Sequence, residues 1–250
     1  MNIEPANKFL KLIPSTVRID GEGVELLLLR EYGAVFAAQG IKVPPAVIFR
    51  SEKEVVEFQS LLRVSTVEIC GYEMTLQKPA MMALQNAVEE TASLGFTISP
   101  RGQDSAARNY LETVALWLSR VEPGLDHWMT EGKISLDDCT RIRKLQPADQ
   151  VNEILALERK GIYFAKDLSK SIIYSVAPPG ASQHLSLLAF DVAEFEQADV
   201  RTILARHGWF QTVISDLPHF TYLGAEESEL PGRGLKRVQS HDRTFWIPDI

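Results

Sequence analysis

The sequence has few cysteines and no excess of basic residues. Its 250 residues include two cysteines, Cys70 and Cys139, which lie far apart and form no C-x-x-C pair. A zinc site built from cysteines is therefore not expected, and the sequence leaves open whether the two form a disulfide. The 26 basic and 33 acidic residues give a net charge of −7, which argues against a nucleic-acid-binding protein.

Long hydrophobic runs are also missing. A membrane-spanning helix requires roughly 18 consecutive apolar residues, and no stretch approaches that length. The longest candidate, residues 24–29, is followed at once by Arg30 and Glu31. The start of the chain lacks the basic and apolar regions of a secretory signal peptide. We therefore expect no transmembrane segment, and a cytoplasmic location unless a leader has been removed.

Three common catalytic signatures are absent, namely H-E-x-x-H, the Walker A loop and G-x-G-x-x-G. The most frequent zinc-protease, phosphate-loop and dinucleotide-binding functions thus have no support. Residues 180–184, Gly-Ala-Ser-Gln-His, resemble a nucleophile elbow. They lack its final glycine, however, and a predicted strand follows them instead of a helix, so a serine hydrolase has little support.

What is present is an ordinary globular mixture, with 45% hydrophobic and 24% charged residues. The patterns predict helices and short strands in mixed order, which indicates an α+β fold. We divide it into a small N-terminal α+β module over residues 1–78 and a second domain over residues 79–250. Helices are predicted at about 51–62, 79–95, 104–120, 135–144, 147–161 and 197–207. Strands are predicted at about 47–49, 64–76, 96–99, 187–192, 209–214 and 219–223, and the last 26 residues show no clear pattern.

Histidines and carboxylates are the candidate metal ligands. Asp191 stands in an otherwise apolar predicted strand, where a buried carboxylate is costly unless it is paired or bound to a metal. His184 precedes that strand, and His219 begins a later one shortly after Asp216. A metal site and a core histidine hydrogen-bonded to a carboxylate are both open on these residues alone.

The surroundings of these residues resemble a known signature. Ser182, His184, Ala189 and Asp191 fall on the pattern S-x-H-x-x-G-x-A-x-D of the zinc D-alanyl-D-alanine carboxypeptidases and dipeptidases, the VanY-like and VanX-like peptidases. Residues 216–224, Asp-Leu-Pro-His-Phe-Thr-Tyr-Leu-Gly, are similar to the later motif that carries the family's third zinc ligand.

The resemblance extends upstream of the signature. Residues 95–101, Gly-Phe-Thr-Ile-Ser-Pro-Arg, are similar to a strand of the family that ends in a Gly-Tyr-Arg-Ser-like motif. A helix follows this segment in both. The resemblance covers roughly residues 79–224, whereas residues 1–78 match no family that we can name. It implies a central antiparallel sheet flanked by helices, with a zinc site.

The family's roles can be carried over residue by residue. The resemblance implies that Zn²⁺ is bound by His184, Asp191 and His219. It also implies that Asp216 is the general base and that Arg101 binds substrate and stabilises the transition state. Ser182 could bind substrate or could simply be a turn residue.

Four positions depart from the family pattern. Leu187 replaces the signature glycine, Pro218 replaces the tryptophan before the last ligand, and Ala106 replaces a glutamine after the arginine. Asp216 replaces a glutamate, which makes the base shorter by one methylene.

The resemblance predicts a zinc peptidase that hydrolyses peptide bonds in peptidoglycan or its precursor peptides, with D-alanine at or near the scissile bond. It also implies a periplasmic or cell-envelope location if a leader was trimmed. Because of the four departures, a catalytically weak zinc-containing binding protein of the same fold is the alternative. A zinc amidohydrolase acting on another peptide is a third possibility.

Overall fold

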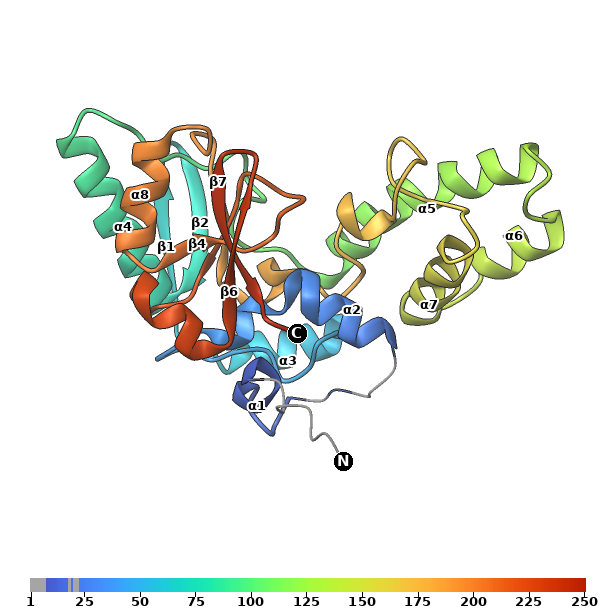
Figure 1. Cartoon of the computed structure of the whole chain (residues 1–250), viewed down its shortest axis with the longest axis horizontal. Helices are drawn as coiled ribbons and strands as arrows, with labels where there is room; N and C mark the ends of the chain where they lie inside the picture. Colours follow the sequence, from blue (N-terminus) through green and yellow to red (C-terminus); the bar gives the residue numbers. More distant parts are fainter. Residues whose placement is uncertain (1–7, 18, 20–22) are drawn as a thin grey trace. The chain divides into compact units, whose positions relative to one another are not determined.

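The structure is a computed structural model that describes residues 8–17, 19 and 23–250, and it divides into two compact units (Figure 1). The first unit contains the described residues up to Val47, together with Glu57–Arg108 and Gln183–Ile250. The second contains Ile48–Val56 and Asn109–Ser182. The chain therefore enters the second unit twice, first at Ile48–Val56 and again at Asn109–Ser182, and it returns to the first unit at Gln183.

A mixture of helices and small antiparallel sheets confirms the predicted α+β class. The predicted domain boundary after residue 78 falls inside the first unit, in the first turn of α4 (Lys78–Ser93). A separate role for residues 1–78 stays a prediction.

The sheet that positions the candidate site has three strands, β3 (Ala189–Asp191), β4 (Trp209–Gln211) and β5 (His219–Tyr222), in the antiparallel order β3-β5-β4. Asp191 is paired with His219, and Phe190 is paired with Phe220. Because side chains alternate along a strand, Asp191 and His219 share one face of the sheet. Phe190 and Phe220 point to the other face, where Phe190 packs edge-on against Trp209.

Two hairpins accompany this sheet in the first unit: β1 (Val64–Ile69) with β2 (Tyr72–Gln77), and β6 (Leu235–Ser240) with β7 (Arg243–Pro248). Helix α4 packs against the first hairpin and lies beside α8 (Ala198–Arg206) (Figure 1). Strand β7 contacts α2 (Gly23–Tyr32) and the 3-10 helix η1 (Gly33–Ala37). Helix α1 (Lys8–Leu12) contacts the 3-10 helix η4 (Glu227–Arg233).

Apolar side chains from all of these elements form the core of the first unit. Burying each one removes it from water, which contributes about 1.5–3 kcal/mol for a large apolar side chain. Fully buried members include Leu29, Ala34, Met74, Leu76, Met81, Leu84, Phe190, Trp209 and Phe245.

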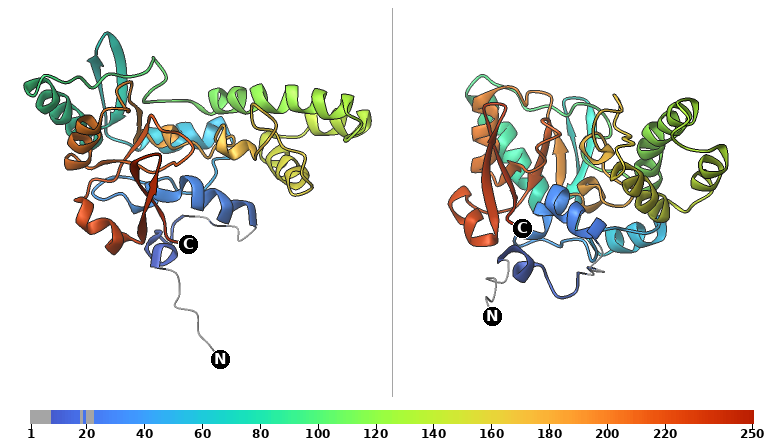
Figure 2. Two further views of the ribbon diagram at one scale, coloured as in Figure 1. Left: turned by 45° about the horizontal axis from the view of Figure 1, so that its top comes forward. Right: turned by 45° about the vertical axis from the view of Figure 1, so that its right-hand side comes forward.

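The second unit is helical, with α5 (Tyr110–Thr130), α6 (Leu136–Arg143), α7 (Pro147–Glu158) and the 3-10 helix η2 (Ile172–Tyr174) (Figure 2). Asn109 begins α5 with a capping box, because its side chain accepts from the Glu112 N–H while Glu112 accepts from the Asn109 N–H. The Trp117 indole N–H donates to Gln150 at 2.9 Å, which ties α5 to α7.

Several predicted elements form close to their expected bounds, including α4, α6, α7 and α8 and the strands β1 to β5. Helix α3 (Glu52–Ser60) also begins where predicted, and the Ser51 hydroxyl accepts from the Glu54 N–H. The predicted start of α5 at Asp104 is wrong, because Asn109 supplies the cap.

Strands predicted at 47–49 and 96–99 do not form. Next to the second segment, Pro100 makes only an isolated bridge with Val192. The Glu194 carboxylate accepts hydrogen bonds from the backbone N–H and the hydroxyl of Ser99, at 2.8 and 2.5 Å. A side chain therefore satisfies the backbone donor that a neighbouring strand would otherwise take.

The last 26 residues are not patternless, as the sequence suggested, because they contain the β6–β7 hairpin. His241 and Asp242 form its turn, with φ angles of 53° and 57°. A two-residue hairpin turn of type I′ needs positive φ at both positions, and Asn-Gly is its usual signal. His-Asp gives no such signal, which is why the hairpin was missed.

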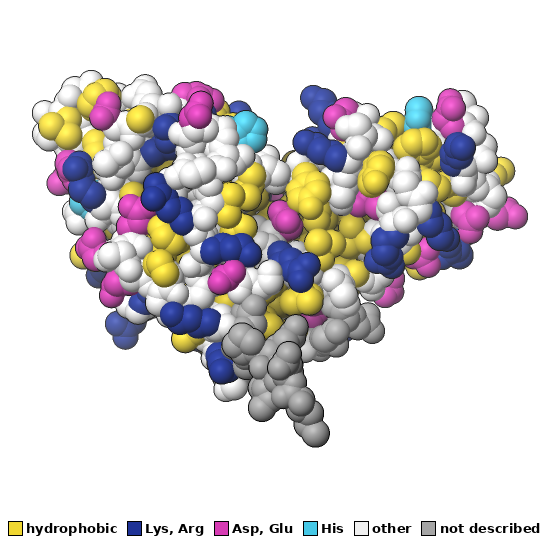
Figure 3. Space-filling model, viewed as in Figure 1, with side chains coloured by type: hydrophobic (Ala, Val, Ile, Leu, Met, Phe, Trp, Pro, Cys, Tyr) yellow, Lys and Arg dark blue, Asp and Glu magenta, His cyan; other side chains and the backbone are white. Residues whose placement is uncertain are grey.

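Charges of both signs share the face drawn in Figure 3, where Lys and Arg side chains are interspersed with Asp and Glu. The net charge of −7 is therefore not gathered into one acidic patch on this face. In the part of the chain that the structure describes, no helix combines the length and apolar character needed to cross a bilayer.

Candidate metal centre

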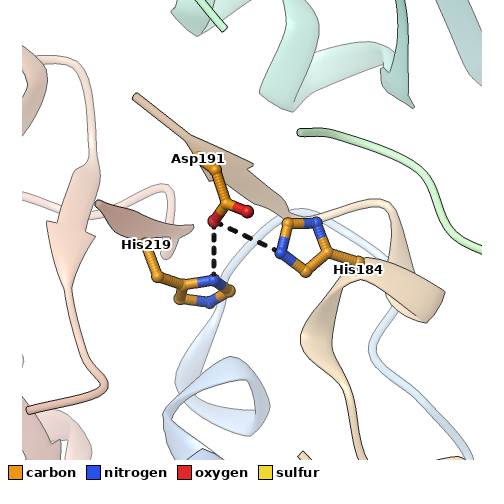
Figure 4. Close-up of side chains that lie close together, drawn as sticks. All are labelled: His184, Asp191 and His219. Atoms are coloured by element: carbon orange, nitrogen blue, oxygen red, sulfur yellow. Dashed lines mark hydrogen bonds and ion pairs between the residues drawn. The ribbon is translucent and has the colours of Figure 1, made fainter. Parts of the chain in front are cut away.

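Three side chains from separate segments of the first unit converge (Figure 4). His184 comes from the 3-10 helix η3 (Gln183–Ser186), Asp191 from the end of β3, and His219 from the start of β5. One potential ligand atom from each lies within 4.8 Å of the others. Asp191 Oδ1 is 3.4 Å from His184 Nε2 and 3.2 Å from His219 Nδ1. The three predicted ligands are thus neighbours in space.

Local backbone geometry explains this arrangement. Asp191 and His219 face each other because they are directly paired across β3 and β5. The chain turns from η3 into β3 at Leu187, which has a φ of 57° and donates its N–H to the His184 carbonyl at 3.2 Å. A left-handed conformation costs a non-glycine residue about 1–2 kcal/mol. Leu187 occupies the signature's glycine position, and its side chain is buried, which offsets this cost.

In each histidine, the ring nitrogen that points away from Asp191 has a hydrogen-bond partner, which selects the tautomer of the neutral ring. His184 Nδ1 lies 3.0 Å from the Ala106 carbonyl, and His219 Nε2 lies 2.9 Å from Gln183 Oε1. Oxygen atoms of these kinds only accept, so both nitrogens carry the proton in the neutral ring. The opposite nitrogens, His184 Nε2 and His219 Nδ1, then present lone pairs to Asp191. This is the outer arrangement typical of metal-bound histidines.

The resulting cluster fits a cation. Two imidazole lone pairs and one carboxylate oxygen face the same space, and like partial charges repel unless a cation lies between them. His184 Nε2 is buried and has no hydrogen-bond partner among the described residues. Two histidines and one carboxylate are also a usual ligand set for catalytic zinc.

Burial and neighbouring charges fix the ionisation states in the direction that metal binding needs. Burial lowers the pKa of His184 against the opposing effect of the Asp191 carboxylate, so the imidazole is held neutral. Burial raises the pKa of Asp191, but its contacts with His184 and His219 outweigh burial and hold that pKa well below its usual value. A metal site requires neutral histidine and ionised carboxylate.

The predicted base Asp216 and the predicted arginine Arg101 are joined to strands β5 and β3 by backbone hydrogen bonds. The Asp216 carbonyl accepts from the His219 N–H at 3.2 Å, and the Arg101 N–H donates to the Asp191 carbonyl at 3.2 Å. Both side chains are exposed. Pro218, one of the departures, accepts from the Val192 N–H at 2.9 Å and so joins the same strands. The catalytic roles of Asp216 and Arg101 stay predictions.

Ser182 is buried at the end of the second unit, whereas the three candidate ligands belong to the first. Its predicted role in substrate binding stays a prediction.

Sequence reasoning missed two residues that contact the cluster. Arg108 Nη2 lies 3.1 Å from Asp191 Oδ2. Gln183 accepts from His219 and from the Thr221 hydroxyl, and its amide donates to the Tyr32 carbonyl at 2.8 Å. Gln183 occupies an unspecified position of the signature, and Arg108 lies outside it, so neither carried a local signal.

Comparisons with known proteins give little further information. No protein-family model matches the chain, and no curated protein matches it. Among solved structures, the chain is similar to the LdcB LD-carboxypeptidase, whose structure is described as revealing the molecular basis of peptidoglycan recognition. That likeness has 14% identity and a TM-score of 0.40, over 75% of this chain and 82% of the other. A likeness at this level carries no argument about chemistry.

Proposed function

We propose that this chain is a zinc-dependent peptidase that hydrolyses peptide bonds in peptidoglycan or its precursor peptides, in the manner of a D-alanyl-D-alanine carboxypeptidase. One observation carries the metal part of the proposal, namely two histidine lone pairs and the Asp191 carboxylate facing one buried space. The substrate class rests on the resemblance of residues 79–224 to the VanY-like and VanX-like peptidases.

His184 Nε2, Asp191 Oδ1 and His219 Nδ1 would hold the zinc ion. Three protein ligands are the number found in catalytic zinc sites, which keep a further position open. When bound, the zinc ion would polarise a peptide carbonyl and lower the pKa of a water molecule to about 7.

Asp216 would act as the general base. Its side chain is open to solvent, and its backbone holds the turn that leads into His219. From this position the carboxylate would accept a proton from the attacking water and deliver it to the leaving amine. General acid–base catalysis of this kind contributes about 10²–10⁴ to a rate.

Arg101 would bind the substrate. Its backbone is anchored to the Asp191 carbonyl, so the root of the side chain is fixed beside β3. The planar guanidinium would hold a peptide carboxylate by two hydrogen bonds or stabilise the developing oxyanion. Ser182 would add a hydroxyl contact to the substrate.

A catalytically weak binding protein of the same fold is the second candidate. One observation favours it: among the described residues, no hydrogen bond or ion pair joins the Asp216 side chain to the three candidate ligands. Asp216 is also shorter than the family's glutamate by one methylene.

Replacement of the proposed base separates the two candidates. Asp216→Asn should leave zinc content and melting temperature nearly unchanged, because the amide is similar in size. Single-turnover hydrolysis of a peptidoglycan-derived peptide should slow by about 10²–10⁴, since an amide cannot accept the proton. The matched control is Asp199→Asn, which alters an exposed carboxylate in the first turn of α8 and should hydrolyse at the wild-type rate.

Equal rates for wild type and Asp216→Asn would remove Asp216 from the mechanism. If zinc-loaded wild type hydrolyses none of a panel of D,D-, L,D- and L,L-peptides, the binding protein is the better description.

A further inference from the structure

Both oxygens of Asp191 have defined partners. Oδ1 faces the two histidine nitrogens, at 3.4 and 3.2 Å. Oδ2 accepts from Arg108 Nη2 at 3.1 Å. The carboxylate is therefore oriented from both sides, and only Oδ1 is directed at the space that the histidine lone pairs face.

The Arg108 guanidinium is itself held in place. Its side chain is 17% exposed and that of Asp191 is 12% exposed, so little water screens their attraction. Asp104 Oδ2, on a side chain that is 68% exposed, approaches the same Nη2 at 3.6 Å. Arg108 Nε is buried and has no hydrogen-bond partner among the described residues. A desolvated guanidinium is costly unless it is paired, which makes Asp191 its main partner.

Each candidate ligand thus has one outer partner from elsewhere in the first unit. The Ala106 carbonyl orients His184, Gln183 orients His219, and Arg108 orients Asp191. A backbone carbonyl cannot be removed by substitution, and Gln183 sits beside a ligand in the chain. Arg108 is the partner whose removal leaves the ligand segments unchanged.

We propose that Arg108 is a positioning residue of the metal centre, which holds Asp191 so that it offers the metal a single oxygen. This inference rests on the proposed function, because it requires a metal at His184, Asp191 and His219. It does not require that the metal be used for peptide hydrolysis.

Removal of the Arg108 side chain would have two opposing effects on zinc affinity. The positive charge of Arg108 repels a metal cation, so removing it would favour binding. Removing it also frees the carboxylate to rotate and to find other partners, which weakens binding. Outer partners of metal ligands usually contribute 10- to 100-fold to affinity, and we expect this orienting effect to win.

Zinc affinity, measured by competition with a chelator, tests the proposal. Arg108→Met keeps the length of the side chain but removes its charge and donors, and should bind Zn²⁺ about 10- to 100-fold more weakly. Arg108→Lys keeps the charge but offers a single nitrogen in place of the planar fork, and should bind zinc about three- to tenfold more weakly. The control Asp104→Asn removes the other carboxylate near Arg108 and should bind zinc with wild-type affinity.

The outcomes distinguish this inference from the proposed function. Unchanged or tighter zinc binding by Arg108→Met overturns the role of Arg108 while leaving the metal site intact. A lower melting temperature of the metal-free variant with unchanged zinc affinity shows a purely structural ion pair and overturns it as well. If Arg108→Met does not fold, wild-type affinity in Arg108→Lys overturns it. Failure of the wild type to bind zinc rejects the metal centre itself.

Discussion

Two buried carboxylates, one in each unit, have pKa values displaced in opposite directions. Asp191 in the first unit faces two histidines and Arg108. Glu158 in the second unit, at the end of α7, accepts from the N–H groups of Phe164 and Ile172, at 3.1 and 2.7 Å, and from the Ser171 hydroxyl. Burial raises the pKa of Glu158, and its three hydrogen bonds only partly oppose that effect. The pKa of Asp191 is instead well below its usual value.

Both side chains are buried, so the opposite displacements of their pKa values come from their partners. Neutral donors from one loop tie Glu158 to residues 164–172. Asp191 is instead in contact with His184 and His219, and these contacts outweigh burial and hold its pKa well below its usual value. A buried carboxylate is therefore not by itself a sign of a metal site.

The largest expected effect is on zinc content when each carboxylate is replaced by its amide. Asp191→Asn should lose the bound metal, because an amide oxygen cannot replace the charge of a carboxylate ligand. His184→Ala and His219→Ala should lose it too, since each removes one of three ligands. Glu158→Gln should retain about one zinc ion per chain, as measured by elemental analysis of purified protein. Full zinc occupancy in His184→Ala would show that the site has been misplaced.

A smaller effect is expected in how the unfolding free energy depends on pH through Glu158. A carboxylate whose pKa is raised on folding stabilises the protein at low pH, and that stabilisation is lost as pH rises from the ordinary value of 4.5 through the raised value. The difference in unfolding free energy between wild type and Glu158→Gln should therefore fall with rising pH across this window. Denaturant titrations at several pH values measure it.

Asp167→Asn is the control for that series, because its carboxylate is fully exposed and lies in the same loop region. A difference between wild type and Glu158→Gln that stays constant with pH would show that burial does not govern Glu158.

The smallest expected effect concerns two leucines with left-handed backbones, one near each carboxylate. Leu187 has a φ of 57° and is buried, whereas Leu168 has a φ of 56° and is only partly buried. At both positions the glycine variant should be more stable than the alanine variant by about 1 kcal/mol, because glycine alone accepts this conformation without strain. Replacement of leucine by alanine should cost more at Leu187, by about 1–3 kcal/mol, since more apolar surface is lost there. Thermal unfolding of the four variants checks both statements, and equal stability of alanine and glycine variants would contradict the first.

Local signals account for what the sequence could predict. Caps and prolines at Ser51, Pro79, Ser135 and Pro147 mark helix starts that the structure confirms. The candidate ligands His184, Asp191 and His219 were singled out by their resemblance to a family signature, and the register of β3 and β5 places Asp191 beside His219.

Long-range contacts account for what it could not predict. Arg108 contacts Asp191 and Gln183 contacts His219, and in each case the two residues are far apart in the sequence. No short sequence pattern could therefore have predicted either contact. Asn109, and not Asp104, caps α5, because either residue type suits the position and only the tertiary structure decides. The β6–β7 turn is formed by His241 and Asp242, which lack the Asn-Gly or Asp-Gly sequence that usually marks a hairpin turn.

The path of the chain between the units has a consequence for how such a protein can change over generations. Residues 109–182 leave the first unit directly after Arg108 and rejoin it directly before Gln183, and these two residues contact Asp191 and His219. Insertions and deletions are best tolerated at exposed loop tips, far from groups that must stay in place. Lineages of this chain should therefore vary in length within the helical segment, while the two junctions accept neither gain nor loss of a residue.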